Sequence, residues 1–238
     1  MLNPDEIERA LVVQAHPDDV DFGAAGTVAT LTDAGVAVTY CLVTDGQAGG
    51  FDLEIPRSEM AVIRRGEQTA AAAEVGVTDL VFLGRMDGEV VADLGLRHDL
   101  TRVIRRVRPD VVMIHPPEIV VSSVYGSHAD HVATGEASWS AVYPDARNPF
   151  AYPELVTDGL QPWAVSEIWI INHPASNAHV DITEQFDRKL RALCCHRSQH
   201  QDPERMMSSV RGWNERNATL GGLPAGLLAE AFLVVDAR

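Results

Sequence analysis

Short apolar segments rich in β-branched residues alternate with segments of helical periodicity through the first half of the chain, and this alternation constrains the fold most. The apolar segments cover residues 10–14, 36–44, 79–84 and 110–115, and the helical segments cover 23–34, 56–76 and 96–108. Strands that alternate with helices form parallel sheets with right-handed crossovers. We therefore predict an α/β fold with a Rossmann-like, doubly wound, mostly parallel sheet and helices on both faces.

The second half of the chain is less regular. We expect helices from about residue 128, over 182–196 and after Pro203, strands over 165–172 and 229–236, and a proline-rich loop over 143–163. A chain of 238 residues is long enough for one α/β domain of ordinary size. Residues 1–238 are therefore expected to form one domain around one continuous core.

The net charge of −15 narrows the classes of partner. A surface of this charge repels nucleic-acid backbones and anionic lipid headgroups unless a local basic patch overrides it. The densest basic segment contains Arg102, Arg105, Arg106 and Arg108, whose helical spacing predicts a solvated helix face. Nucleic acid is therefore not expected as a partner.

The cysteines and the hydropathy indicate a cytoplasmic protein. Cys41, Cys194 and Cys195 show neither metal-binding nor disulfide spacing, which favours a reducing compartment. The first residues lack the basic and apolar regions of an export signal, and no run of about 18 apolar residues could enter a membrane. The sequence is compatible with both a monomer and a homo-oligomer.

Four ionisable residues crowd the loop after the first predicted strand: His16, Asp18, Asp19 and Asp21. Groups this dense repel one another unless solvent or a cation neutralises them, and an imidazole beside a carboxylate suits Zn²⁺. A solvated turn with helix-capping aspartates explains the same residues. Taken alone, this segment leaves the two interpretations open.

A histidine pair occurs at the predicted helix start near the middle of the chain. His128 and His131 lie three positions apart, so they share one helix face. The pair alone is also compatible with two surface residues. Together with His16 and Asp19, however, it can supply three ligands and leave one coordination position open, as a catalytic zinc requires.

A third polar group lies in the segment 181–199 and contains Asp181, Thr183, Lys189, His196, Ser198 and Gln199. Asp181 and Thr183 have the character of helix N-capping residues, and His196 of a residue that ends the helix. The residues alone assign no chemistry to this segment.

In this order, the segments AHPDDVDFG, TDGQAGG, RRGEQTAAAAEVG, GSHADH and DITEQFDRKLRALCCHRSQ resemble the LmbE/PIG-L family of N-acetylglucosaminyl deacetylases over nearly the whole chain. The resemblance implies a zinc-dependent hydrolase that removes the acyl group of a small N-acyl amino sugar conjugate. It implies zinc ligands at His16, Asp19 and His131. Asp18 corresponds to the general base, and His128 to the residue that stabilises the oxyanion or assists proton transfer. The resemblance further implies substrate contacts at Arg64 and Asp87.

One position departs from the family pattern, because Ala129 stands where the family often has proline. Asp130 is retained and could orient a ligand imidazole through a hydrogen bond to the ring nitrogen that does not bind the metal. Fe²⁺ suits the same ligands as Zn²⁺. The single three-ligand set disfavours a metal-dependent phosphoesterase, which would be an alternative function. The absence of a G-x-G-x-x-G segment disfavours the other alternative, a Rossmann-like sugar or nucleotide binding module. The sequence does not specify the sugar conjugate.

Overall fold

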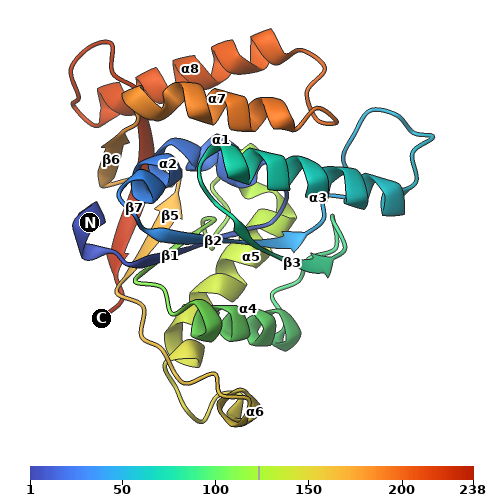
Figure 1. Cartoon of the computed structure of the whole chain (residues 1–238), viewed down its shortest axis with the longest axis vertical. Coiled ribbons are helices and arrows are strands. Elements are labelled where there is room, and N and C mark those ends of the chain that lie inside the picture. Colours follow the sequence, from blue (N-terminus) through green and yellow to red (C-terminus); the bar gives the residue numbers. More distant parts are fainter. Residues whose placement is uncertain (123) are drawn as a thin grey trace.

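A central sheet organises the computed structural model, which describes residues 1–122 and 124–238 (Figure 1). Within these residues the sheet has seven strands in the order β3-β2-β1-β4-β5-β7-β6. Their bounds are β1 (Arg9–Gln14), β2 (Ala37–Thr44), β3 (Asp79–Arg85), β4 (Val111–Ile114), β5 (Glu167–Ile171), β6 (Ala178–Asp181) and β7 (Ala229–Asp236).

Five neighbouring strands of the sheet, β3, β2, β1, β4 and β5, pair in parallel. β7 pairs antiparallel with both β5 and β6. The order 3-2-1-4-5 is that of a doubly wound Rossmann-like sheet, so the predicted fold class is confirmed. β6 was not expected, because its four residues, Ala-His-Val-Asp, form no apolar run.

Helices cover both faces of the sheet (Figure 1). One face carries α1 (Asp19–Gly23), α2 (Ala25–Asp33), α3 (Arg57–Glu74) and α7 (Phe186–Cys195), with α8 (Pro203–Leu220) outermost. The other carries α4 (Leu94–Val107), α5 (Ala129–Ser140) and, farthest from the sheet, α6 (Pro153–Thr157). Shorter turns are η1 (Pro4–Glu6), η2 (Tyr125–Ser127), η3 (Ala141–Ala146) and η4 (Thr183–Gln185). No helix of the described residues is both long and apolar enough to cross a membrane.

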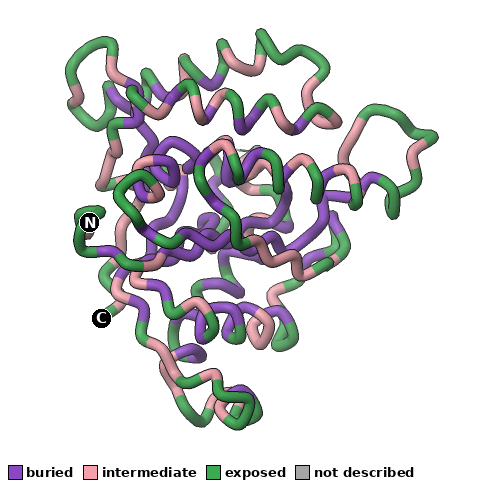
Figure 2. The backbone as a smooth tube through the Cα atoms, viewed as in Figure 1, coloured by how far each residue is buried: buried purple, intermediate pink, exposed green. Residues whose placement is uncertain are grey.

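The side chains of β1 alternate between the two cores, as the period of a strand requires. Val12 packs into the core beneath α2, α3 and α7, whereas Leu11 and Val13 pack into the core beneath α4 and α5. Figure 2 shows the result, a buried sheet between helices whose outer surfaces are exposed. Burial on both faces explains why these strands are continuously apolar.

Two expectations for the helices need correction. The segment 23–34 is divided between α1 and α2, which join at Ala24, and the segment 143–163 contains α6 as well as loop.

The predicted solvated face of arginines is wrong for Arg105, which is only 2% exposed. Its guanidinium donates hydrogen bonds to four backbone carbonyls, those of Asp145, Ala146, Asn148 and Ala151. Arg105 thus fastens this irregular segment to α4.

Candidate metal and active site

The loops that follow β1, β3 and β4 bring the predicted site residues together at the carboxyl ends of the parallel strands. β1 pairs with β4, so the loop after β1 lies beside the segment that leads from β4 into α5. The carboxyl edge of an open α/β sheet is where such folds bind ligands. The structure joins six of the predicted residues in one connected set of contacts, namely His16, Asp19, Asp87, His128, Asp130 and His131. The other two, Arg64 and Asp18, form an ion pair with each other, and Asp18 precedes Asp19 in the chain.

Three of these residues point nitrogen and oxygen atoms at a common centre. His16 Nδ1 lies 3.3 Å from Asp19 Oδ2 and 3.3 Å from His131 Nε2. His131 Nε2 lies 3.2 Å from Asp19 Oδ1. Zn–N and Zn–O bonds of about 2.0–2.2 Å place neighbouring donors of a tetrahedral site about 3.3–3.5 Å apart. The spacing and the chemistry of this triad, His16, Asp19 and His131, therefore fit a divalent metal ion.

The second ring nitrogen of His16 faces two carboxylates. His16 Nε2 lies 3.1 Å from Asp130 Oδ2 and 3.2 Å from Asp87 Oδ1. Asp130 is itself fixed by the backbone N–H groups of Gly88 and Val90. Burial opposes a charge on His16, but the hydrogen bonds that its ring donates to the carboxylates of Asp130 and Asp19 raise its pKa to about 12. A carboxylate behind the imidazole orients the ring so that Nδ1 faces the metal position.

His115 adds an imidazole that the sequence analysis missed. It follows β4 directly and stacks on His131, with ring centroids 4.1 Å apart. Its Nε2 lies 3.3 Å from Asp19 Oδ2 but also accepts a hydrogen bond from the Ala15 N–H. Burial lowers the pKa of His115 to about 4, so the ring is neutral. The lone pair of Nε2 already accepts the hydrogen bond from Ala15, so it is not free to bind a metal. We therefore assign His115 a supporting role, in which its ring packs against His131.

Asp18 lies beside the triad and is held by α3. Its Oδ2 accepts a hydrogen bond of 3.0 Å from Arg64 Nη2, and its backbone N–H donates to Gln68 Oε1 at 2.8 Å. Burial raises the pKa of Asp18 to about 6, although the charge of Arg64 works in the opposite direction. A carboxylate of this pKa accepts a proton readily near neutral pH.

Arg64 and Asp87 both form hydrogen bonds with the loops around the site. The Arg64 side chain is buried and donates to the carbonyl oxygens of Gly46 and Pro17 as well as to Asp18. Asp87 accepts a hydrogen bond from the Ala48 N–H besides its contact with His16. Both residues shape the loops around the site, and their contact with substrate stays a prediction.

His128 occupies the start of α5, where its Nδ1 accepts a hydrogen bond from the Asp130 N–H. Its ring lies edge-on to His16, with centroids 5.0 Å apart, and is exposed to solvent. With Nδ1 occupied by the backbone, Nε2 is the atom available to a ligand. His128 is therefore placed to reach a molecule that lies over the triad.

The sequence did not predict that His115 and Gln68 contact the residues of the site. The position of His115 at the end of a predicted strand is a signal that could have found it. Gln68 gives no such signal, because one glutamine on a long helix resembles a surface residue.

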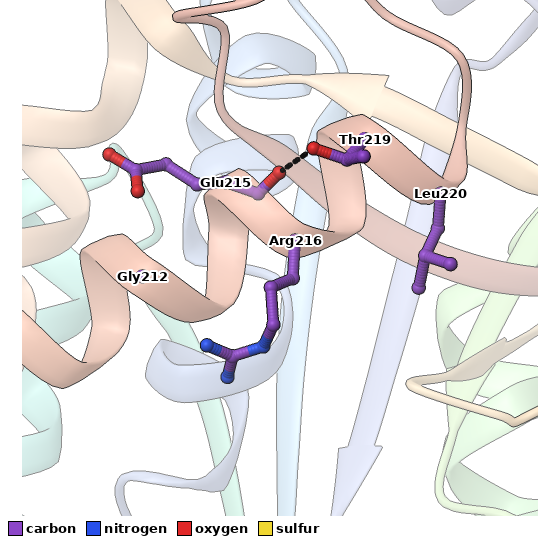
Figure 3. Close-up of a pocket in the computed structure, with 5 residues that line it drawn as sticks. All are labelled: Gly212, Glu215, Arg216, Thr219 and Leu220. Atoms are coloured by element: carbon purple, nitrogen blue, oxygen red, sulfur yellow. Dashed lines mark hydrogen bonds between the residues drawn. The ribbon is translucent and has the colours of Figure 1, made fainter.

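A hollow of about 540 Å³ lies away from the triad, along α8. Figure 3 shows its lining, with the Thr219 hydroxyl donating to the Glu215 carbonyl at 3.0 Å. None of the lining residues, Gly212, Glu215, Arg216, Thr219 and Leu220, belongs to the set of contacts around the triad. This hollow is therefore separate from the triad at the sheet edge.

Comparison with known proteins identifies relatives of this chain. The profile of the family described as GlcNAc-PI de-N-acetylase, PIG-L, matches residues 11–142. Diacetylchitobiose deacetylase from Thermococcus kodakarensis is 32% identical over 194 residues, which cover 82% of this chain and 71% of the relative. A probable N-acetyl-α-D-glucosaminyl L-malate deacetylase 2 from Bacillus cereus is 34% identical over 196 residues, which cover 79% of this chain and 82% of the relative.

A solved structure matches nearly the whole chain. It is N,N′-diacetylchitobiose deacetylase from Pyrococcus horikoshii in complex with an inhibitor, with a TM-score of 0.90 and 30% sequence identity. The match covers 98% of this chain and 85% of that protein. The similarity therefore includes the second half of the chain, beyond the segment that the family profile covers.

Proposed function

Because this chain belongs to the PIG-L family of de-N-acetylases, we propose that it is a zinc-dependent hydrolase of a small N-acetylglucosamine conjugate. The reaction cleaves the acetamide and releases acetate and a free amine. The observation that carries the proposal is the triad of His16, Asp19 and His131, whose donor atoms lie 3.2–3.3 Å apart beside Asp18.

The substrate class follows from what the relatives share. Their names specify diacetylchitobiose and N-acetyl-α-D-glucosaminyl L-malate, which have an N-acetylglucosamine unit in common. The moiety attached to the sugar differs between these relatives. We therefore assign the N-acetylglucosamine unit to this chain and leave the attached group to experiment.

The proposed metal ligands are His16 Nδ1, the Asp19 carboxylate and His131 Nε2. A divalent zinc ion bound there would supply a Lewis acid that polarises the amide carbonyl and makes water more acidic. Asp130 and Asp87 hold His16 from the opposite side of its ring. Fe²⁺ accepts the same imidazole and carboxylate ligands, so metal analysis must decide between the two ions.

Asp18 is the proposed general base. Its carboxylate takes a proton from the attacking water, and as a carboxylic acid it can return that proton to the leaving amine. The Arg64 guanidinium, 3.0 Å away, favours the ionised carboxylate before the proton arrives. The raised pKa of Asp18, about 6, makes its carboxylate a stronger base than that of an ordinary aspartate, so it takes the proton from water more readily.

His128 is proposed to donate a hydrogen bond to the oxyanion that develops from the amide carbonyl. Its Nδ1 is held by the Asp130 N–H, which fixes the ring and leaves Nε2 for the donation. Arg64 and Asp87 are proposed to border the sugar hydroxyls, in addition to their contacts with Asp18 and His16.

Metal content and amine release test the proposal together. The purified chain is analysed for metals and then incubated with N,N′-diacetylchitobiose and a panel of N-acetylglucosamine conjugates. One equivalent of zinc with release of amine and acetate supports the hydrolase. Release of inorganic phosphate from sugar phosphates without amine would favour a phosphoesterase, whereas sugar binding without metal or turnover would favour a binding module.

A cytoplasmic location and a single domain over residues 1–238 are proposed with the function. Cys41, Cys194 and Cys195 are free thiols, which suits a reducing compartment. Cell fractionation and limited proteolysis of the full chain test the two proposals.

A further inference from the structure

Gln68 is a buried polar residue whose amide contacts Asp18, the proposed base, at one end and Asp21 of α1 at the other. It lies on the inward face of α3, one turn after Arg64, and its side chain is inaccessible to solvent. Gln68 Oε1 accepts the Asp18 N–H at 2.8 Å, and Gln68 Nε2 donates to Asp21 Oδ2 at 2.9 Å. The amide therefore spans the start of α1.

The backbone of Asp18 requires such support. Its φ angle is 89°, in the left-handed region that residues with a Cβ adopt rarely. A strained residue persists only where its surroundings hold it, and such residues concentrate at functional sites. Here the holding contacts come from α3, through Gln68 at the backbone and Arg64 at the carboxylate.

Asp21 and His196 fix the direction in which the Gln68 amide points. Asp21 Oδ2 lies 2.8 Å from His196 Nε2, and both side chains are fully buried. An amide NH₂ group only donates hydrogen bonds and a carboxylate oxygen accepts them, so Gln68 turns its NH₂ group toward Asp21 Oδ2. The carbonyl oxygen of Gln68 must then face the Asp18 N–H.

The buried His196–Asp21 pair makes few hydrogen bonds beyond its contact with Gln68. Among the described residues, Asp21 Oδ1 and His196 Nδ1 have no hydrogen-bond partner. A buried ion pair is a weak source of stability, because desolvation offsets the attraction, and such pairs instead can specify one geometry. The geometry specified here is that of Gln68 and, through it, of Asp18.

Helix α7, which ends directly before His196, also fixes the far end of α1. Lys189 Nζ donates to the Phe22 carbonyl at 2.6 Å and to Glu230 Oε1 at 2.5 Å. Glu230 in turn accepts the N–H groups of Gly26 and Thr27 at the start of α2. The segment 181–199, to which the sequence assigned no chemistry, thus supports at two points the helix α1 that follows the proposed base.

We propose that Gln68, oriented by Asp21 and His196, is a positioning residue that holds Asp18 in place for proton transfer. The inference rests on the proposed hydrolase function. Displacement of a catalytic group by about 1 Å can lower the rate about 100-fold. The Gln68→Met variant, which keeps the length of the side chain without the amide, is therefore expected to lower kcat by about 10- to 100-fold with KM within about twofold.

Three variants separate positioning from stability. Asn214→Leu removes another buried amide, which donates to the Val210 carbonyl within α8, and it should destabilise the chain without a matching fall in kcat. Asp21→Asn retains an oxygen that can accept from Gln68 and should keep most of the turnover, whereas Asp21→Leu should match Gln68→Met. An equal fall in kcat for Gln68→Met and Asn214→Leu would overturn the proposal.

A measurement that needs no turnover completes the test. Amide hydrogen exchange of Asp18 in the full-length chain is expected to accelerate at least about 10-fold in Gln68→Met and to stay unchanged in Asn214→Leu. Unchanged exchange in Gln68→Met would overturn the proposal even if kcat fell. If the wild-type chain released no amine from any conjugate, the proposed function would fail, and the exchange rates would still show whether Gln68 holds Asp18.

Discussion

Nδ1 of His16 lies 3.3 Å from Nε2 of His131, although the two residues are 115 positions apart in the chain. His16 follows β1, and His131 lies in the first turns of α5, which is reached through β4. The pairing of β1 with β4 is therefore what brings the two rings together. Asp19 lies within 3.3 Å of both nitrogens, so any cation at this point would be bound jointly by two distant segments.

Removal of one triad imidazole should abolish metal binding. The His131→Ala variant is expected to retain less than about a tenth of the metal of the wild-type chain after dialysis, because two ligands hold zinc poorly where three are needed. Elemental analysis measures the metal directly. His98→Ala is a matched control, since His98 pairs with Glu154 on α6 outside the triad. Equal metal content in His131→Ala and wild type would exclude His131 as a ligand.

Asp18→Asn should separate metal binding from catalysis. The amide of asparagine resembles the carboxylate in shape but is a poor proton acceptor, so kcat is expected to fall about 10²- to 10⁴-fold. The metal content should stay near that of the wild type, because Asp18 is outside the triad. Near-normal turnover by Asp18→Asn would show that another group takes the proton.

The pH dependence of turnover should respond to Arg64. Burial raises the pKa of Asp18 to about 6, and the Arg64 charge opposes that rise. A base acts when deprotonated, so kcat/KM should fall as the pH drops through about 6. Arg64→Gln removes the opposing cation, which raises the pKa of Asp18 further and moves the acid limb to higher pH. Arg64→Lys keeps the charge and should move the limb less; identical limbs in all three chains would contradict the assignment.

His128→Gln should lower kcat more than it raises KM. Loss of one donor to a developing oxyanion typically costs about 3–4 kcal/mol of transition-state stabilisation, or about 10²- to 10³-fold in kcat. Steady-state kinetics on an N-acetylglucosamine conjugate measure both constants. A change confined to KM would instead assign His128 to substrate binding.

The strand and helix pattern predicted the parallel part of the sheet because continuous apolar runs such as Val111–Ile114 have few alternatives to a buried strand. The crowding of His16, Asp18 and Asp19 after β1 likewise predicted where polar side chains would gather. Both signals are contained in short segments of the sequence. The polar segments follow predicted parallel strands, and the carboxyl ends of such strands lie at one edge of the sheet.

Other features depend on contacts that no local pattern contains. β6 is a strand only because β7 offers it a partner, and Arg105 is buried only because backbone carbonyls of residues 145–151 surround it. His115 and Gln68 have the same character: one stacks on a histidine from α5, and the other contacts two carboxylate residues from the loop after β1 and from α1. A sequence pattern gives the face of a helix but not the groups that will face it.

Gly135 on α5 fixes how closely that helix approaches the segment after β4. A Cβ at this position would lie 2.6 Å from the Pro116 carbonyl oxygen and 2.7 Å from that of His115. Both atoms belong to the backbone, so Gly135→Ala cannot be accommodated by a side-chain rotation and must displace α5. We expect a loss of about 1–3 kcal/mol in the free energy of unfolding, measured by denaturant titration.

The same displacement should weaken metal binding, because His131 lies one turn before Gly135 on α5. Gly212→Ala on α8 is the matched control, since a Cβ there would meet only the far end of the Arg216 side chain, at 3.6 Å. That substitution is expected to stabilise the chain by about 0.4–1 kcal/mol and to leave metal affinity unchanged. If Gly135→Ala were as stable as Gly212→Ala and bound zinc equally well, close packing of α5 on the segment after β4 would not be what holds His131 in the triad.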